Sequence, residues 1–397
     1  MKNLYIFILS LSVISLCSAG TAGAQQTVTL EEAINIALNN RPKMKVAETT
    51  IENTRAGKGQ SWQIGSTSFG YTQNVQPSAG NMDRELAISQ SFGSLMTPFY
   101  NNALINKQVR TDELNYELVE REVIAEVKQA WVNYLYAATL CMVYQEQVDV
   151  AARLEKVCID KYECGKINSL EKKQTTAHAA EMRNKLISAI ESRNVAAEKL
   201  QWVTFSENMI IPEDSVITKI TLSRLEPGLA DVYTDYYASQ VEEQAARINV
   251  AKSGFFPGLS AGYTINKIAN PTDVNTFNVG LSIPIFFAPQ RSQIRQAQFG
   301  KMIAEYNAEE QVKSLTNQVE EIIANIKRYE VSIDYYTVHS MPEADDLLAE
   351  TYRHMDKGDI PIQQYIQSFM TALNIRTGYL QELYNYNINV LKYELYR

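Results

Sequence analysis

A long stretch without proline, from about Phe99 to Tyr162, constrains the fold more than any other part of the sequence. Apolar residues recur along it in steps of three and four or their multiples: Val127, Trp131, Tyr134, Ala138, Cys141, Val148 and Ala152. That spacing predicts one helix with a coiled-coil seam. At 1.5 Å per residue the helix would be about 96 Å long, which is too long for one globular domain.

The long helix is expected to end in a tight turn at Gly165, because glycine readily adopts the left-handed conformation that closes a helix. Asn168 or Ser169 can then cap a return helix that runs to about Val203. The sequence therefore predicts a helical hairpin over about 99–203.

A second hairpin is expected over about 290–397. Its first helix carries a seam in alternating steps of four and three: Leu315, Val319, Ile322, Ile326, Tyr329, Ile333 and Tyr336. Pro342 should kink or break that helix, since proline removes a backbone donor. The turn is placed at Gly358, and the last helix runs to Arg397.

A pair of strands is predicted before each long helix, at about 66–76 and 84–93 and at about 257–268 and 275–287. Apolar side chains alternate with small polar ones in all four; in the second pair the apolar set is Leu259, Ala261, Tyr263, Ile265, Phe277, Val279, Leu281, Ile283 and Ile285. Side chains alternate between the two faces of a strand. This pattern suits a strand with lipid on one face and a polar lumen on the other, although a half-buried soluble strand shares it.

The same order of elements is written twice at nearly equal spacing. From Ser91 to Gly165 is 74 positions (165 − 91), and from Ser282 to Gly358 is 76 (358 − 282). We therefore divide the chain into a first structural repeat, residues 25–226, and a second, residues 227–397. Each holds a helix, two strands, a long helix, a tight turn and a return helix, which indicates a duplicated half.

Residues 1–24 have the features of a secretory signal peptide: a short basic start, an apolar run and small residues up to Ala24. A lipid anchor on Cys17 is the less favoured alternative, because the bulky Leu16 stands where a small residue is usual. No later stretch approaches about 18 continuous apolar residues, so the mature chain is expected to have no transmembrane helix. If the chain spans a membrane, it must then do so with strands in a closed barrel.

Composition and motifs speak against several other functions. The net charge of −8 argues against nucleic-acid binding, and Cys141, Cys158 and Cys164 are too few and irregular for a disulfide framework. His178, His339 and His354 have no metal-ligand spacing, so no metal or cofactor is expected.

A nucleophile pattern, G-x-S-x-G, occurs at residues 258–262 around Ser260. A nucleophile elbow needs a sharp turn between a strand and a helix, but here the strand alternation continues straight through the serine. An esterase is therefore disfavoured, and no catalytic residue is expected.

Four strands cannot close a membrane barrel, since the smallest such barrels have about eight. Three copies would supply twelve strands and would unite the long helices in one tube, which is closure by symmetry. The predicted fold class is therefore mostly α with a β-barrel: a homotrimer whose 12-stranded barrel continues into an α-helical tunnel.

The chain resembles the TolC-like outer membrane efflux channels over nearly all of its mature length. The resemblance rests on Leu30-Glu31-Glu32-Ala33 with Ala37-Leu38 and Asn40-Arg41-Pro42, on the segment 279–286 before the second long helix, and on the turns at Gly165 and Gly358. It implies an outer membrane location with the tunnel in the periplasm. It also implies a passive exit duct that works with a periplasmic adaptor (membrane fusion) protein and an inner-membrane pump of the resistance-nodulation-division type.

The two helical turns are the candidate sites for adaptor docking and for the gate: Tyr162, Gly165, Lys166 and Leu170 at the first, and Met355, Asp356, Gly358, Asp359, Gln364 and Gln367 at the second. Family members often have a tyrosine three residues before the turn glycine, which this chain keeps only in the first turn. Some carry acidic rings where Gln364 and Gln367 stand here, so no acidic ring is expected from those two. Asp356 and Asp359 could form a ring instead or simply cap helix ends.

One alternative of a different class stays open. A secreted or periplasmic structural coiled-coil protein without channel activity would also contain long seamed helices. The alternation in all four strands favours the channel, because a soluble sheet has no reason to keep both hairpins so alike.

Overall fold

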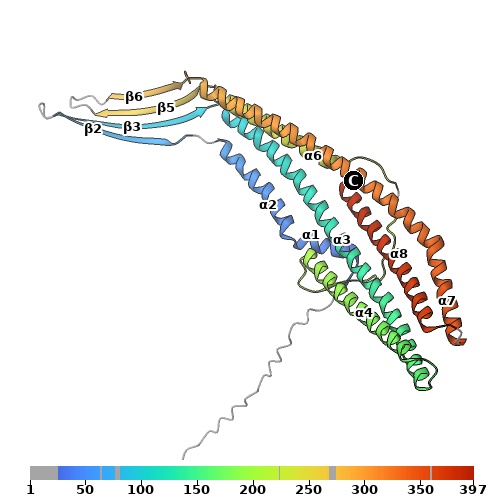
Figure 1. The fold of residues 1–397 in the computed structure, drawn as a ribbon. Coiled ribbons are helices and arrows are strands. Elements are labelled where there is room, and N and C mark those ends of the chain that lie inside the picture. The colour runs from blue at the N-terminus through green and yellow to red at the C-terminus, as the bar shows by residue number, and fades with distance from the viewer. Residues whose placement is uncertain (1–25, 63–64, 77–80, 223, 268–273, 358–359) are drawn as a thin grey trace, which may run out of the picture.

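The computed structural model describes residues 26–62, 65–76, 81–222, 224–267, 274–357 and 360–397. The predicted signal peptide and Cys17 lie outside these ranges. The molecule is elongated, with all four long strands at one end and the helices running away from them to two turns at the other end (Figure 1).

The first half begins with a capped helix. Thr29 and Glu32 form a reciprocal capping box, in which the Thr29 amide donates to Glu32 Oε2 at 2.8 Å and the Glu32 amide donates to Thr29 Oγ1 at 3.3 Å. The elements of this half are β1 (Gln26–Val28), α1 (Leu30–Asn40), α2 (Pro42–Ala56), a 3₁₀ segment η1 (Gly57–Trp62), β2 (Thr67–Gln76), β3 (Asn81–Ser94), α3 (Thr97–Glu163), α4 (Ser169–Thr204) and β4 (Ile210–Pro212).

The second half repeats the order of helix, two strands, long helix, turn and helix. Its elements are α5 (Asp231–Ser253), β5 (Gly258–Lys267), β6 (Val274–Ser282), α6 (Ala288–Tyr335), a π-helical turn η2 (Tyr336–Ser340), α7 (Met341–Lys357) and α8 (Ile362–Tyr396). Pro342 lies just after the π turn, so the long helix is interrupted where the sequence predicts. No helix in the described ranges is long and apolar enough to cross a membrane.

Strand β6 is shorter than expected, because it ends at Ser282 and not at Phe287. Pro284 follows two residues later and has no amide to give to a ladder. Ile283 and Ile285 therefore lie outside the strand to which the sequence pattern assigned them, although both are exposed.

The four long strands form one antiparallel sheet in the order β2-β3-β5-β6. Both hairpins join in the middle through β3 and β5, so β2 and β6 are the edges. Within the described residues neither edge strand has an outer partner. A separate parallel pair, β1 with β4, ties the start of the described chain to the segment that follows α4.

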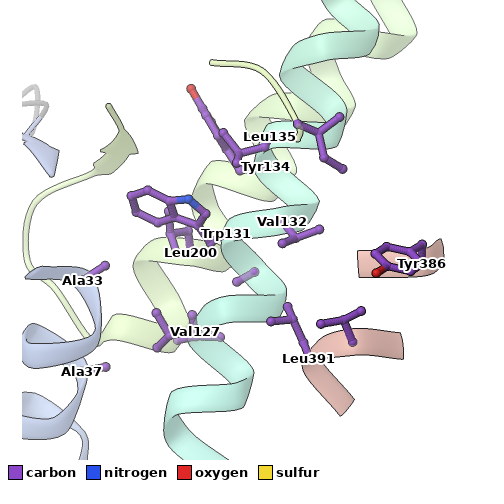
Figure 2. Close-up of a cluster of buried hydrophobic side chains, with 14 of the residues drawn as sticks. Ala33, Ala37, Val127, Trp131, Val132, Tyr134, Leu135, Leu200, Tyr386 and Leu391 are labelled. Atoms are coloured by element: carbon purple, nitrogen blue, oxygen red, sulfur yellow. The ribbon is translucent and has the colours of Figure 1, made fainter. Parts of the chain in front are cut away.

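The main hydrophobic core surrounds the middle of α3. Val127 on α3 and Leu200 on α4 are both 0% exposed, and α1 and α8 close the remaining sides with Ala33, Ala37, Tyr386 and Leu391 (Figure 2). Between residues 130 and 141 most side chains of α3 are buried, whichever direction they point. This helix is therefore enclosed and has no single buried stripe there.

The predicted seam of α3 holds as far as Val148, which is half-buried. Beyond it Ala152 is exposed, and the buried positions are instead Val150, Ala151 and Leu154. A straight α-helix has 3.6 residues per turn, so a stripe drawn with a period of 3.5 drifts around it with distance. The seam of α6 holds throughout, since Val319, Ile322, Ile326 and Ile333 are buried and the rest are half-buried.

The segment between α4 and α5, here called the connecting strap (residues 205–222 and 224–230), lies across α3 and α8. Side chains of those helices satisfy its backbone. The Ile217 amide donates to Thr139 Oγ1 at 2.9 Å, and the Ile220 amide donates to Asn387 Oδ1 at 3.0 Å. Asn387 is itself buried, and its Nδ2 donates back to the Thr218 carbonyl at 2.8 Å.

Candidate membrane face and helical tips

One face of the four-stranded sheet carries apolar side chains that lie in register across every strand. The central row runs Phe69, Ile88, Tyr263 and Phe277. The row nearer the hairpin ends is Tyr71, Leu86 and Ile265, and nearer the helices Ala261 pairs with Val279 and Leu259 with Leu281. Phe69 is 79% and Phe277 71% exposed. An apolar surface shared by four strands marks an interaction face, because soluble monomers rarely expose one of this extent.

The opposite face carries small and polar groups. One row there is Ser68, Ser89, Gly262 and Asn278, and the next is Ser91, Ser260 and Gly280. A Cβ placed on Gly280 would stand only 2.4 Å from Ser260 Oγ, so a side chain at Gly280 would force the serine to move. Ser260 is the third residue of β5, on a continuous strand and not at an elbow, as the alternation predicts.

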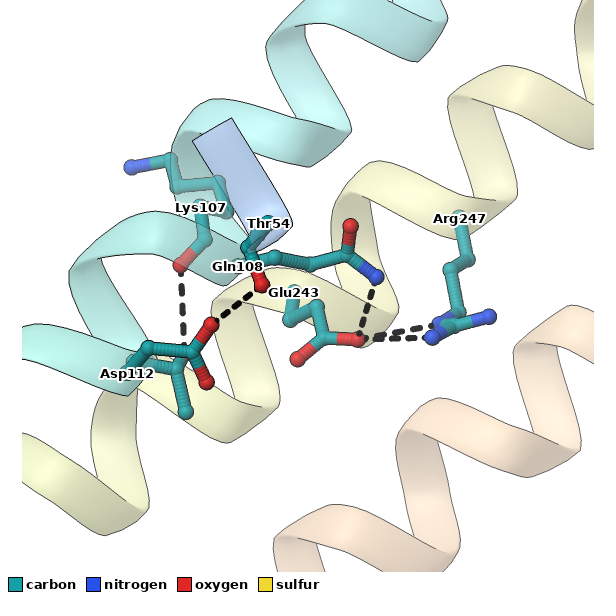
Figure 3. Close-up of polar contacts among 7 residues, drawn as sticks. Thr54, Lys107, Gln108, Asp112, Glu243 and Arg247 are labelled. Carbon is teal, nitrogen blue, oxygen red and sulfur yellow. Dashed lines mark hydrogen bonds and ion pairs between the residues drawn. The ribbon is translucent and has the colours of Figure 1, made fainter. Parts of the chain in front are cut away.

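Polar contacts hold the helices together where they meet the sheet (Figure 3). Thr54 Oγ1 on α2 donates to Asp112 Oδ2 on α3 at 2.6 Å. Gln108 on α3 donates to Glu243 on α5 at 3.3 Å, and Arg247 approaches the same carboxylate at 2.7 Å. Three helices from both halves are therefore cross-linked just below the strands.

The first tip, at the turn between α3 and α4, brings four predicted residues together. Gly165 has φ of +68°, a conformation that side chains disfavour, and its amide donates to the Tyr162 carbonyl at 2.9 Å. Lys172 lies over the Tyr162 ring at 4.6 Å from its centroid. Leu170 and Lys166 are exposed. Asn168 caps α4 by the same reciprocal arrangement that starts α1, through Glu171.

The second tip lies at the same end of the molecule (Figure 1). Gln364 and Gln367 are exposed on the first turns of α8 and line a shallow groove between α7 and α8 with Leu347 and Thr371. Met355 and Asp356 belong to the last turn of α7, where only the backbone is described. Gly358 and Asp359 lie outside the described residues, so their expected role stays a prediction.

The two tips belong to one packed unit. A hydrophobic cluster joins the hairpins down to the turns: Val150, Leu154 and Cys158 from α3, Ala344 and Leu348 from α7, and Ile362, Tyr365, Phe369 and Ala372 from α8. Burial raises the pKa of the Cys158 thiol, which keeps this residue an apolar filler and not a reactive thiolate. Cys141 is buried as well, whereas Cys164 is exposed.

Arg376 is a polar link between the hairpins that sequence patterns do not reveal. From α8 it contacts Asp345 on α7 at 2.9 Å and Glu146 on α3 at 3.2 Å. Burial opposes its charge, but the hydrogen bonds and attraction of both carboxylates outweigh burial and raise its pKa. Its partners lie 31 and 230 residues away, a separation that no local motif records.

No protein-family model and no curated protein sequence matches the chain. Solved structures do match it over most of its length. A membrane protein from Pseudomonas aeruginosa aligns with a TM-score of 0.80 at 15% identity, covering 93% of each chain. The CmeC outer membrane channel of Campylobacter jejuni aligns with a TM-score of 0.75 at 16% identity, covering 92% of this chain and 85% of that one.

The MtrE outer membrane channel of Neisseria gonorrhoeae, solved in an open state, aligns with a TM-score of 0.72 at 15% identity, covering 92% of this chain and 88% of that one. Identities this low establish a common fold and nothing finer. At that level the expected resemblance to TolC-like outer membrane channels is confirmed.

Proposed function

We propose that this chain is the outer membrane channel of a tripartite efflux system, a passive exit duct for substrates that an inner-membrane pump exports. The observation that supports this most strongly is the sheet itself. One apolar row crosses all four strands and shorter apolar rows flank it, the other face is small and polar, and within the described residues both edges are open. A sheet of this kind suits lipid on one side and a water-filled lumen on the other.

The unpaired edge strands of the sheet determine how copies of the chain assemble. Lipid offers no partner to unpaired backbone groups, so β2 and β6 must pair with strands of other copies. Strands of 10 and 9 residues have the length that spans a membrane when tilted. Three copies, with β6 of one beside β2 of the next, make a closed barrel of twelve strands. The proposed molecule is therefore a homotrimer whose barrel lies in the outer membrane.

The helices then form a tunnel in the periplasm. An exposed apolar stripe on α6, made of Phe299, Met302, Ile303 and Tyr306, follows helical spacing and suits packing against a neighbouring copy. The two tips lie farthest from the membrane. We assign them to the periplasmic adaptor protein and to the gate, with a resistance-nodulation-division pump beyond. Transport through the duct needs no catalytic residue or cofactor of its own.

The assembly is tested on outer membrane fractions, with unheated and boiled samples compared on a detergent gel. A band near three times the monomer mass that disappears on boiling is expected. The alternative, a secreted or periplasmic coiled-coil protein, predicts a monomer released without detergent. That outcome would remove the barrel and the duct together.

The gate is tested separately with paired cysteines placed between the two tips, for example at Lys166 and Gln364, in a chain where Cys164 is serine. Oxidation should stop export while trimers stay intact, and a reductant should restore it. Each single-cysteine chain is the matched control. Unchanged export from fully cross-linked trimers would refute the assignment of the gate to the tips and leave the barrel untouched.

A further inference from the structure

Two cations lie directly opposite each other on the apolar face of the sheet. Arg84 on β3 pairs with Lys267 on β5, and Gln73 on β2 completes the row. Their side chains point to the same side as those of Leu86 and Ile265, which are two residues nearer the helices. Both cations are exposed.

No described residue near the two cations balances their charges. Within the part of the chain that the structure describes, neither cation has an ion-pair partner. The described strands carry no acid on this face, and Glu85 points to the opposite one. Facing residues on neighbouring strands have Cβ atoms roughly 5 Å apart, and like charges at that distance destabilise a sheet. Among the described residues both charges are therefore left available to an anion from outside the chain.

The position of the row defines where that anion must be. Lys267 lies eight residues along β5 from Leu259. At about 3.4 Å per residue and a tilt of about 40°, this is about 21 Å along the membrane normal. Phe255 and Phe287 stack at 5.7 Å just before Leu259, at the helical end. The apolar band of such a barrel is about 25 Å tall with aromatic girdles, so the cations fall at its far boundary.

We propose that Arg84 and Lys267 bind the phosphate of an anionic lipid headgroup in the outer leaflet. The inference rests on the proposed function, because it takes the sheet to be in the membrane and the helices in the periplasm. The aliphatic stems lie along the apolar face while the charged ends reach the headgroups. The planar guanidinium of Arg84 suits two phosphate oxygens, and Lys267 adds a point charge.

The ring of Tyr71, in the row below, supports this boundary. Its hydroxyl donates to Gln73 Oε1 at 3.0 Å, so it is directed toward the cation row while its ring stays on the apolar face. Tyrosines take this posture where a membrane meets water. Each trimer would carry three such phosphate sites around its outer rim.

The test uses trimers in phosphatidylcholine vesicles that contain a small fraction of lipid A, which bears phosphate groups. Lipid A that stays with the purified trimer is measured by mass spectrometry. The variants are R84Q/K267Q, the charge-preserving R84K/K267R, and a control, K45Q/K313Q, that removes two exposed cations from helices. Loss of both cations should weaken lipid A retention about 25-fold, about fivefold for each. The control should match the wild type, and R84K/K267R should retain most binding.

Equal retention by R84Q/K267Q and wild-type trimers would overturn this inference and leave the proposed function standing. A wild-type chain that forms no membrane trimer would overturn both, and the gel described above detects that case first. Inorganic phosphate at matched concentration separates a lipid site from a free phosphate site. If it displaces lipid A, the ligand is phosphate alone and the lipid assignment fails.

Discussion

The two long helices, α3 and α6, occupy equivalent places in the repeated order but have different surroundings. The middle of α3 is enclosed by α1, α4, α8 and the connecting strap, so side chains on all its sides are buried. Helix α6 is buried only along its seam, and residues such as Val331 and Tyr335 on its other faces are exposed. A further difference is continuity, since α3 runs for 67 residues and α6 gives way to a π turn.

Two helices at equivalent places in the repeated order of elements can therefore have different surroundings. The strap, which joins the two halves, and α1, which lies in the first half, both pack on α3. Helix α6 keeps its other faces free, which in the proposed trimer are the faces available to other copies. Both halves therefore contribute to the core of the protomer, and α6 in addition keeps exposed faces.

The largest effect is expected from a charge in the enclosed helix. Val127→Asp places a carboxylate at a position that is 0% exposed, whereas Val331→Asp places one at a position that is 72% exposed. The buried charge should lower the free energy of unfolding by more than about 4 kcal/mol, so that the chain no longer folds. Circular dichroism and protease resistance should show a folded V331D protein. A folded V127D protein would contradict the enclosure of α3.

The next largest effect is expected from cavities, which should destabilise the protein more beside α3 than beside α6. Leu200 and Ile326 are both 0% exposed, the first beside α3 and the second in the seam of α6. Substitution of such a residue by alanine lowers the free energy of unfolding by about 2–5 kcal/mol. The loss is smaller where the surrounding side chains can collapse into the cavity. We expect Leu200→Ala near the upper end and Ile326→Ala near the lower end, because α6 has open faces into which neighbours can relax. Urea denaturation of both variants measures the difference, and equal losses would contradict it.

A substitution that crowds the π turn of the second half should have an intermediate effect on stability. A Cβ on Gly378 of α8 would come within 2.7 Å of the Tyr336 hydroxyl and 3.3 Å of the ring carbon that bears it. Gly378→Ala should therefore cost about 1–3 kcal/mol by overpacking. Removing the hydroxyl with Tyr336→Phe should recover part of that loss in the double variant. Strictly additive losses would show that Tyr336 does not occupy the space left by the glycine.

The smallest effect concerns pH and the first hairpin. Burial lowers the pKa of His178 on α4 below its ordinary value of 6.5, against an opposing effect of Glu181. The unfolded chain therefore binds a proton more readily, and stability from the neutral histidine is lost as pH falls from about 6.5 through the folded pKa. The urea midpoint should fall over that range in the wild type and fall less in His178→Gln. Identical pH profiles of the urea midpoint in the two proteins would refute the assignment of this pH dependence to His178.

Local chemistry made part of this fold predictable. Asn168 caps a helix, Gly165 turns left-handed and the α6 seam is buried, because each depends on residues within a few positions or on one buried face. The α3 seam failed at Ala152, because a stripe drawn with a period of 3.5 drifts around a straight helix. Of the tip residues, the sequence could group Tyr162 with Leu170, but the bridge from Arg376 depends on tertiary packing.

Pairing between strands was equally hidden. Alternation assigns Arg84 and Lys267 to the apolar faces of their strands, but only the register places them opposite each other. Similarly, nothing in the sequence around Asn387 shows that its side chain serves the strap, because donor and acceptor are 167 residues apart. These missed contacts are long-range and polar, whereas the early end of β6 and the drift of the α3 seam are local misses.

The connecting strap has a consequence for how the protein is made. Its amides at Ile220 and Glu226 need acceptors on α8, Asn387 and Tyr393, near the end of the described chain. Synthesis delivers the first hairpin long before those acceptors exist. The middle of the protomer can therefore close only when its last helix arrives, so maturation follows completion of the chain. Contacts between residues this far apart in the sequence also slow folding. Until folding is complete, the strands lack their partners.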